Sequence, residues 1–166
     1  MKNLEAFYQL IAELEQDYDF IQESTQKNHL MDQRIQTSKH PDEFDYAALG
    51  YTLHNLYNAY EAYFFRIAKF FENNLDEATW HKSLLQRMTL TIENVRPQVI
   101  PIPFAHRLEE LLRFRHVFRN LYKTSLNPEK VRFVQTSAQG LQEDFAQHHN
   151  QFIQFVRDLG KRVGNG

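Results

Sequence analysis

Residues 49–71 read LGYTLHNLYNAYEAYFFRIAKFF and make up the most apolar stretch of the 166-residue chain. Apolar residues recur there every three or four positions, the spacing that places them on one face of an α-helix. Further tyrosines and phenylalanines widen this face until the segment is apolar almost all round, which is typical of a helix at the centre of a bundle. We therefore predict a central helix from about Asp42 to Asn74, beginning after the turn at Pro41.

Polar residues inside the apolar seams need partners, and three of them are informative. His54 and Glu61 lie seven positions apart, on one face of the central segment. Because an unpaired buried carboxylate is costly, we expect Glu61 to pair with an arginine of the segment Arg113–Arg119. His54 is either a hydrogen-bonded core histidine or part of a site. His148 falls in the seam of the last predicted helix, where we expect a hydrogen-bonded core histidine.

Helical periodicity also predicts four further helices, and no segment of useful length alternates like a strand. Two of them are long, from about Asn3 to His29 and from about Pro128 to Leu159. Two are shorter, from about Glu77 to Ile92 and from about Phe104 to Lys123. The chain is therefore predicted to be an all-α antiparallel bundle of about five helices, three long and two shorter.

Length and composition set further limits. A chain of this size is predicted to be one domain, residues 1–160, followed by a tail, residues 161–166, that should fray. The absence of cysteine excludes disulfides, thiol nucleophiles and cysteine-based zinc sites, and fits a cytoplasmic location. No apolar run suits a signal peptide or a membrane span, so we expect no membrane partner. Without a glycine-rich phosphate loop or a recognisable set of metal ligands, we expect no cofactor and no metal.

Charge is distributed unevenly along the chain, although the net charge is only −2. Residues 1–80 carry 6 Lys and Arg against 14 Asp and Glu, whereas residues 81–132 carry 10 against 4. Such a division indicates a polar surface for a partner, a local anion-binding site, or basic and acidic helices that pack against each other within the chain.

The basic segment has its densest part at Arg113 to Tyr122, which reads RFRHVFRNLY. On a continuous helix Arg115, Arg119 and Tyr122 share a face. An arginine fork suits a phosphate, and a histidine can transfer a proton near neutral pH. Those two groups suffice for metal-free cleavage of RNA through its own 2′-hydroxyl. The alternative is an amphipathic helix whose arginines simply extend to water.

Several blocks of the sequence together have the pattern of a known family. The blocks are, in order, Leu53–Tyr57, Glu61, Ile67–Lys69, Trp80–Leu85 and Phe114–Tyr122. Over about Asp45 to Val134 they resemble the HepT-like branch of the HEPN superfamily. The resemblance implies an all-α bundle that usually forms a homodimer. It further implies an RNase toxin whose partner is an MNT-type nucleotidyltransferase antitoxin, which adds AMP to a tyrosine beside the active site.

The resemblance also assigns roles to individual residues. Arg115 matches the catalytic arginine of the family, His116 the polar position after it, and Tyr122 the tyrosine that receives AMP. Asn120 occupies the position of the catalytic histidine, and an asparagine can hydrogen-bond but cannot serve as a general base. His116 is then the expected proton carrier. The supporting residues are Glu61, Arg119 and His54.

Three functions remain open on the sequence alone. The first is a metal-independent endoribonuclease toxin, regulated by a nucleotidyltransferase antitoxin. The second is a catalytically inactive relative that binds RNA, a nucleotide or a protein partner. The third is a helical interaction bundle without an anion site.

Overall fold

The computed structural model describes residues 2–72, 76, 78–121 and 125–166. This part of the chain folds as an all-α bundle, and its only β-type pairing is one isolated bridge between Ile92 and Arg96. The predicted fold class is therefore confirmed. The helices are α1 (Leu4–Thr37), α2 (Glu43–Phe71), α3 (Trp80–Met88), α4 (Ile102–Arg119), α5 (Pro128–Ala138) and α6 (Leu141–Gly164).

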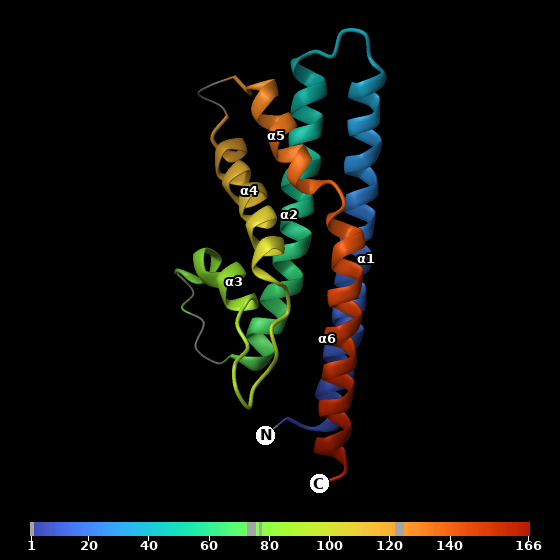
Figure 1. Cartoon of the computed structure of the whole chain (residues 1–166), viewed down its shortest axis with the longest axis vertical. Coiled ribbons are helices and arrows are strands. Elements are labelled where there is room, and N and C mark those ends of the chain that lie inside the picture. Colours follow the sequence, from blue (N-terminus) through green and yellow to red (C-terminus); the bar gives the residue numbers. More distant parts are fainter. Residues whose placement is uncertain (1, 73–75, 77, 122–124) are drawn as a thin grey trace.

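The central position predicted for the most apolar segment is also confirmed, because α2 contacts α1, α3, α4 and α5. Figure 1 shows α1 and α2 antiparallel, with α4 and α5 beside α2 and with α6 returning along α1. The short α3 lies to one side, near the end of α2. No helix in the described residues has both the length and the apolar character needed to cross a membrane.

A capping box fixes the start of α2 where the sequence predicts it. The Asp42 carboxylate accepts hydrogen bonds from the backbone N–H groups of Phe44 and Asp45, and the Asp45 carboxylate accepts one from the backbone N–H of Asp42. These bonds satisfy donors that the first helical turn leaves free, and the negative charges suit the helix dipole. The predicted end of this helix, at Asn73 and Asn74, lies outside the described residues.

The first helix is longer than predicted, since α1 continues past His29 to Thr37. The apolar pattern weakens there because buried Asn28 replaces an apolar residue. Its amide exchanges two hydrogen bonds of 2.8 Å with the amide of Gln135 on α5. Ile35 is buried about two turns further on. Pairing with another helix thus compensates for a polar residue in the seam.

A break at Gly140 corrects the prediction of one long helix from Pro128 to Leu159. Gly140 has a φ of +73°, a left-handed conformation that ends α5 and that glycine adopts without strain. The Arg107 side chain holds this corner, donating to the carbonyls of Ser137 and Gln139 and pairing with Asp144.

The C-terminal helix extends further than expected, because α6 runs to Gly164 and so includes most of the segment 161–166. Val163 packs on the core, and Gly164 lies so close to Leu4 of α1 that a Cβ atom would come within 2.9 Å of its side chain. Packing between the two terminal helices therefore orders the last turn.

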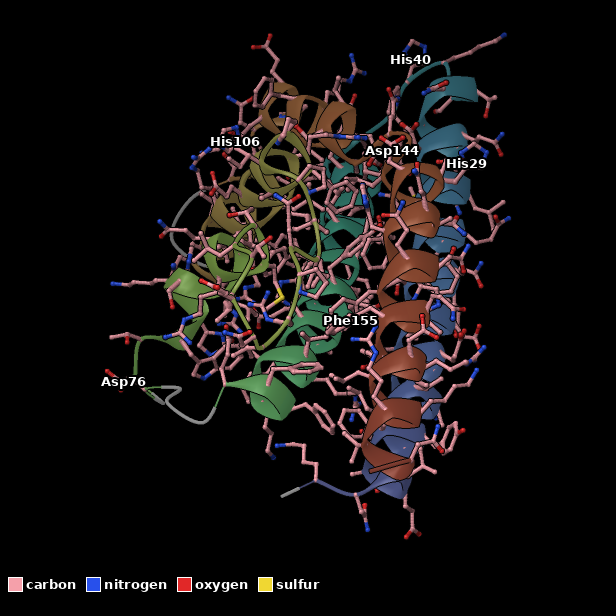
Figure 2. The ribbon with its side chains drawn as sticks, turned by 60° about the horizontal axis from the view of Figure 1, so that its bottom comes forward. His29, His40, Asp76, His106, Asp144 and Phe155 are labelled. Atoms are coloured by element: carbon pink, nitrogen blue, oxygen red, sulfur yellow. The ribbon has the colours of Figure 1, made fainter. Side chains whose placement is uncertain are left out.

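Because α6 begins at Leu141, His149 rather than His148 lies on its buried face. The expectation that His148 is a hydrogen-bonded core histidine is therefore wrong. The Tyr63 hydroxyl donates to His149 Nδ1 at 2.8 Å, and His149 Nε2 donates to Glu15 at 3.2 Å. Its ring also stacks on Tyr18, with centroids 4.0 Å apart. The neutral imidazole thus uses both of its nitrogen atoms in the core. By contrast, His29, His40 and His106 are exposed and point outward (Figure 2).

Acidification is expected to destabilise the protein through His149. Burial lowers the pKa of His149 below its ordinary value of 6.5, more than the Glu15 carboxylate raises it. The unfolded chain therefore takes up this proton first, so stability is full above about pH 6.5 and falls as the pH drops towards the folded-state pKa. Urea unfolding at about pH 7.5 and about pH 5.5 measures the loss, which should be smaller in His149→Gln. Equal losses in the two proteins would contradict this assignment.

Candidate functional site

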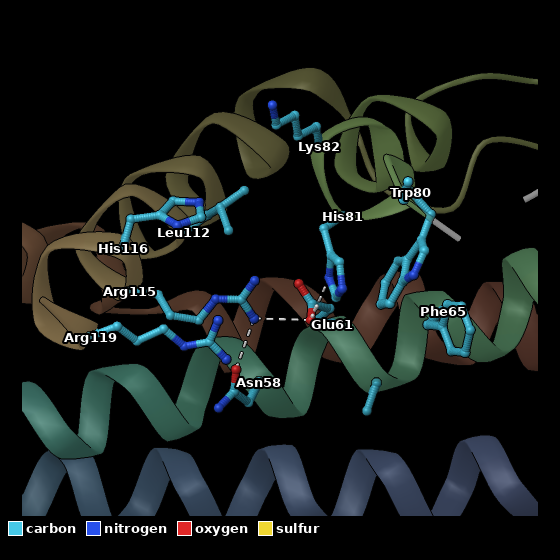
Figure 3. Close-up of a pocket in the computed structure, with 12 residues that line it drawn as sticks. Asn58, Glu61, Phe65, Trp80, His81, Lys82, Leu112, Arg115, His116 and Arg119 are labelled. Carbon is cyan, nitrogen blue, oxygen red and sulfur yellow. Dashed lines mark hydrogen bonds and ion pairs between the residues drawn. The ribbon is translucent and has the colours of Figure 1, made fainter. Parts of the chain in front are cut away.

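A pocket of about 540 Å³ lies where α2, α3 and α4 meet (Figure 3). Its lining combines aromatic rings with charged and amide groups. The lining residues are Asn58, Glu61, Ala62, Phe65, Ala78, Trp80, His81, Lys82, Leu112, Arg115, His116 and Arg119.

A buried ion pair forms the floor of this pocket. Arg115 Nη1 donates to Glu61 Oε1 at 2.9 Å and to Asn58 Oδ1 at 3.0 Å. The Arg115 and Glu61 side chains are only 4% and 11% exposed, and the guanidinium carbon lies 4.7 Å from the centre of the Tyr57 ring. The predicted pairing of Glu61 with an arginine of the basic segment is therefore confirmed.

His54 lies behind the floor and does not line the pocket. The Asn58 amide donates to His54 Nε2 at 3.1 Å, so Asn58 connects His54 to Arg115. The His54 ring also packs against Phe118, with centroids 5.6 Å apart. Burial, together with the charges of Arg119 and Arg115, lowers the pKa of His54. This histidine is therefore a neutral support for the floor at neutral pH.

The rim of the pocket is basic and exposed. Arg119 and His116 reach it from α4, and His81 and Lys82 reach it from α3. With neutral histidines, the lining carries three cationic side chains and one carboxylate, which gives a net charge of +2. Such a surface attracts anions.

The second half of the basic segment differs from the prediction, because α4 ends at Arg119 rather than near Lys123. Asn120 is the C-cap of this helix, and its side-chain amide donates to the carbonyl of His116 at 2.8 Å. Asn120 is exposed and does not line the pocket, so it does not join the other predicted site residues. Tyr122, the predicted site of AMP addition, lies outside the described residues.

Sequence reasoning about the site missed the contribution of α3. His81 Nδ1 lies 3.2 Å from Glu61 Oε1, and the Trp80 ring stacks on the His81 ring with centroids 3.5 Å apart. The Phe65 ring of α2 packs against the Trp80 ring, with centroids 4.2 Å apart. Trp80, His81 and Lys82 belong to one of the blocks that resemble the HepT-like branch, which was the only signal that could have pointed to them.

Arg96 fixes α3 in its place over α2. Its side chain is fully buried and donates to the backbone carbonyls of Arg87, Leu90 and Pro97, and to Glu72 Oε1 at 2.8 Å. One guanidinium thus joins the residue after α2 to the last turn of α3 and to the loop that follows. The predicted third helix, Glu77–Ile92, ends earlier than expected, at Met88, because these hydrogen bonds stabilise a turn instead. Its predicted start at Glu77 lies outside the described residues.

The arrangement supplies groups for binding an anion and for transferring a proton. Glu61 Oε2 and Arg115 Nε are buried and have no hydrogen-bond partner among the described residues. The two histidines of the rim lie on different helices, and the aromatic wall offers apolar surface next to them. Within the described residues, no three side chains of His, Asp or Glu converge as metal ligands.

Comparison with known proteins identifies the family of the chain. Searches of curated proteins and of solved structures gave no match. The model of the family described as HepT-like protein matches residues 48–156, which include most of α2, all of α3 and α4, and the whole pocket. Since this match covers more than half of the sequence, the chain belongs to the HepT-like protein family.

Proposed function

We propose that this HepT-like chain is the toxin component of a toxin–antitoxin module and cleaves RNA without a metal ion at the pocket between α2, α3 and α4. The observation that carries the proposal is a pocket with a net charge of +2 in which two histidines accompany a buried Arg–Glu pair. Phosphodiester cleavage by the 2′-hydroxyl requires positive charge at the phosphate and groups that move protons.

In this proposal Arg119 and Lys82 attract the phosphate, because both are exposed at the rim. Arg115 lies against the pocket as well, but Glu61 offsets its charge. Arg115 therefore contributes mainly by holding Glu61 and Asn58 in position. His116 is exposed beside Arg119 and serves as the proton donor to the leaving group.

Family membership further supports a partner and a form of regulation. An MNT-type nucleotidyltransferase antitoxin is proposed to add AMP to Tyr122, which follows Arg119 by three residues in the sequence. A bulky anion attached there would compete with RNA for the basic rim. We also propose a homodimer, as the resemblance to HepT-like toxins implies, and a cytoplasmic location, which the absence of cysteine fits.

The position of Asn120 favours a second function, a module that binds RNA without cleaving it. Asn120 stands where the resemblance places a catalytic histidine, yet its amide is bonded to its own helix outside the pocket. A chain that lost this base could retain the basic rim and its affinity for RNA.

An RNA cleavage assay in EDTA tests the proposal. We expect the purified protein to cleave single-stranded RNA, and we expect Lys82→Ala/Arg119→Ala to lower kcat/KM about 100-fold, since each lost charge-assisted contact costs roughly tenfold. Arg113→Ala/Lys130→Ala is the matched control, because it removes two exposed cations that do not line the pocket. This control should stay within about threefold of the parent. RNA binding without cleavage would favour the second function. A purified protein that neither binds nor cleaves RNA would overturn the proposal.

A further inference from the structure

We infer that His81 is the general base of this pocket and that Glu61 orients it, so that a histidine on α3 takes the place of the one missing at Asn120. The inference rests on the proposed function and adds a residue that neither the sequence pattern nor the family match assigns. Three features of the pocket carry it: the contact with Glu61, the stacking on Trp80, and the lack of an equivalent arrangement at the other histidines near the pocket.

The contact with Glu61 favours one tautomer of His81. His81 Nδ1 lies 3.2 Å from Glu61 Oε1, within ion-pair distance, and an ionised carboxylate only accepts hydrogen bonds, so the contact favours the ring with its proton on Nδ1. In the neutral ring the lone pair is then on Nε2. The His81 side chain is 49% exposed whereas that of Glu61 is 11% exposed. The ring therefore contacts the carboxylate at the floor of the pocket (Figure 3), while about half of its side chain stays exposed to a substrate.

The surroundings of Glu61 and His81 hold this geometry in place. Arg115 Nη1 donates to the same carboxylate oxygen, Oε1, and is itself tied to Asn58. Trp80 covers one face of the imidazole at 3.5 Å, and Phe65 supports Trp80. A carboxylate that orients a histidine and fixes its tautomer is the arrangement that general-base catalysis uses. Glu61 and Arg115 are accordingly positioning residues.

The other histidines near the pocket lack this arrangement. His54 lies behind the floor, where its Nε2 accepts a hydrogen bond from Asn58. His116 lines the pocket, but no carboxylate among the described residues contacts its ring. Its exposed ring suits a group that donates a proton to the departing alcohol.

The proposed step is balanced in atoms and protons. His81 Nε2 removes the proton of an RNA 2′-hydroxyl while that oxygen attacks the adjacent phosphorus. The bond from phosphorus to the 5′-oxygen breaks, and protonated His116 gives its proton to that oxygen. The products are a 2′,3′-cyclic phosphate end and a 5′-hydroxyl end, and a proton passes from His81 to water and from water to His116.

Kinetics of His81→Gln and His116→Gln across pH test this assignment, with a fluorogenic RNA in EDTA. We expect His81→Gln to lower kcat at least about 100-fold while KM stays within about threefold. A base must be unprotonated, so the parent rate should rise with pH on the acid side, and His81→Gln should lose that rise. His116→Gln should instead lose the fall on the alkaline side.

Two outcomes separate this inference from the proposed function. A parent protein that cleaves no RNA overturns the proposed function and this assignment with it. A parent that cleaves while His81→Gln keeps its rate and its acid-side rise overturns the assignment alone. Nitrogen-15 NMR of the imidazoles gives a readout besides activity: we expect the proton on His81 Nδ1, and this preference should disappear in Glu61→Gln. A proton on Nε2 in the parent would also overturn the assignment.

Discussion

Replacing Glu61 with leucine is expected to lower the free energy of unfolding by about 3 kcal/mol, because it leaves the Arg115 guanidinium buried without a counter-charge. The two side chains are almost completely buried and joined at 2.9 Å. Leucine fills a similar volume, so the loss reports on the unpaired charge rather than on a cavity. Urea unfolding monitored by far-ultraviolet circular dichroism measures the change.

A double-mutant cycle isolates the ion pair from other effects of the substitutions. Arg115→Met alone should cost about as much as Glu61→Leu, because it strands the carboxylate. The double variant should lose markedly less than the sum of the two single losses, since it leaves no unpaired charge. Additive losses, or a loss below about 1 kcal/mol in either single variant, would contradict the description of this pair as coupled and buried.

The central helix and its ion pair could be predicted because both follow from local rules. Apolar periodicity indicated the buried faces of α2, and a carboxylate among aromatic residues required a cationic partner, which proved to be Arg115. Helix ends set by tertiary contacts could not be predicted. The extension of α1 depends on the Asn28–Gln135 amide pair, and the division at Gly140 depends on a corner that Arg107 holds from α4.

The site could be predicted only where one segment carries it. Arg115, His116 and Arg119 were identified because they lie within five residues of each other on α4. His81 and Lys82 reach the same pocket only because the buried Arg96 guanidinium fixes the end of α3. No spacing along the chain encodes that placement. The prediction that Asn120 lies in the site failed for a related reason, because the helix was expected to continue beyond this residue and instead ends at Arg119.

RNA affinity is expected to fall about 100-fold when Lys82 and Arg119 are both replaced by alanine, because each lost charge-assisted contact costs roughly tenfold. Both side chains are cations at the rim, and no carboxylate among the described residues pairs with either of them. Arg115, by contrast, is paired with Glu61. Each contact between a protein cation and a phosphate of a single strand contributes about 0.7 to the slope of log affinity against log salt concentration. Two lost contacts should therefore reduce that slope by about 1.4.

The most direct measurement is fluorescence anisotropy of a non-cleavable 2′-deoxy-modified RNA oligonucleotide, titrated at several salt concentrations between about 50 and 200 mM. We expect weaker binding and a shallower salt slope for Lys82→Ala/Arg119→Ala. We expect near-parental values for Arg113→Ala/Lys130→Ala, which lowers the net charge of the protein by the same amount. Equal effects of the two double variants, or no effect of either, would show that RNA does not bind at the pocket between α2, α3 and α4.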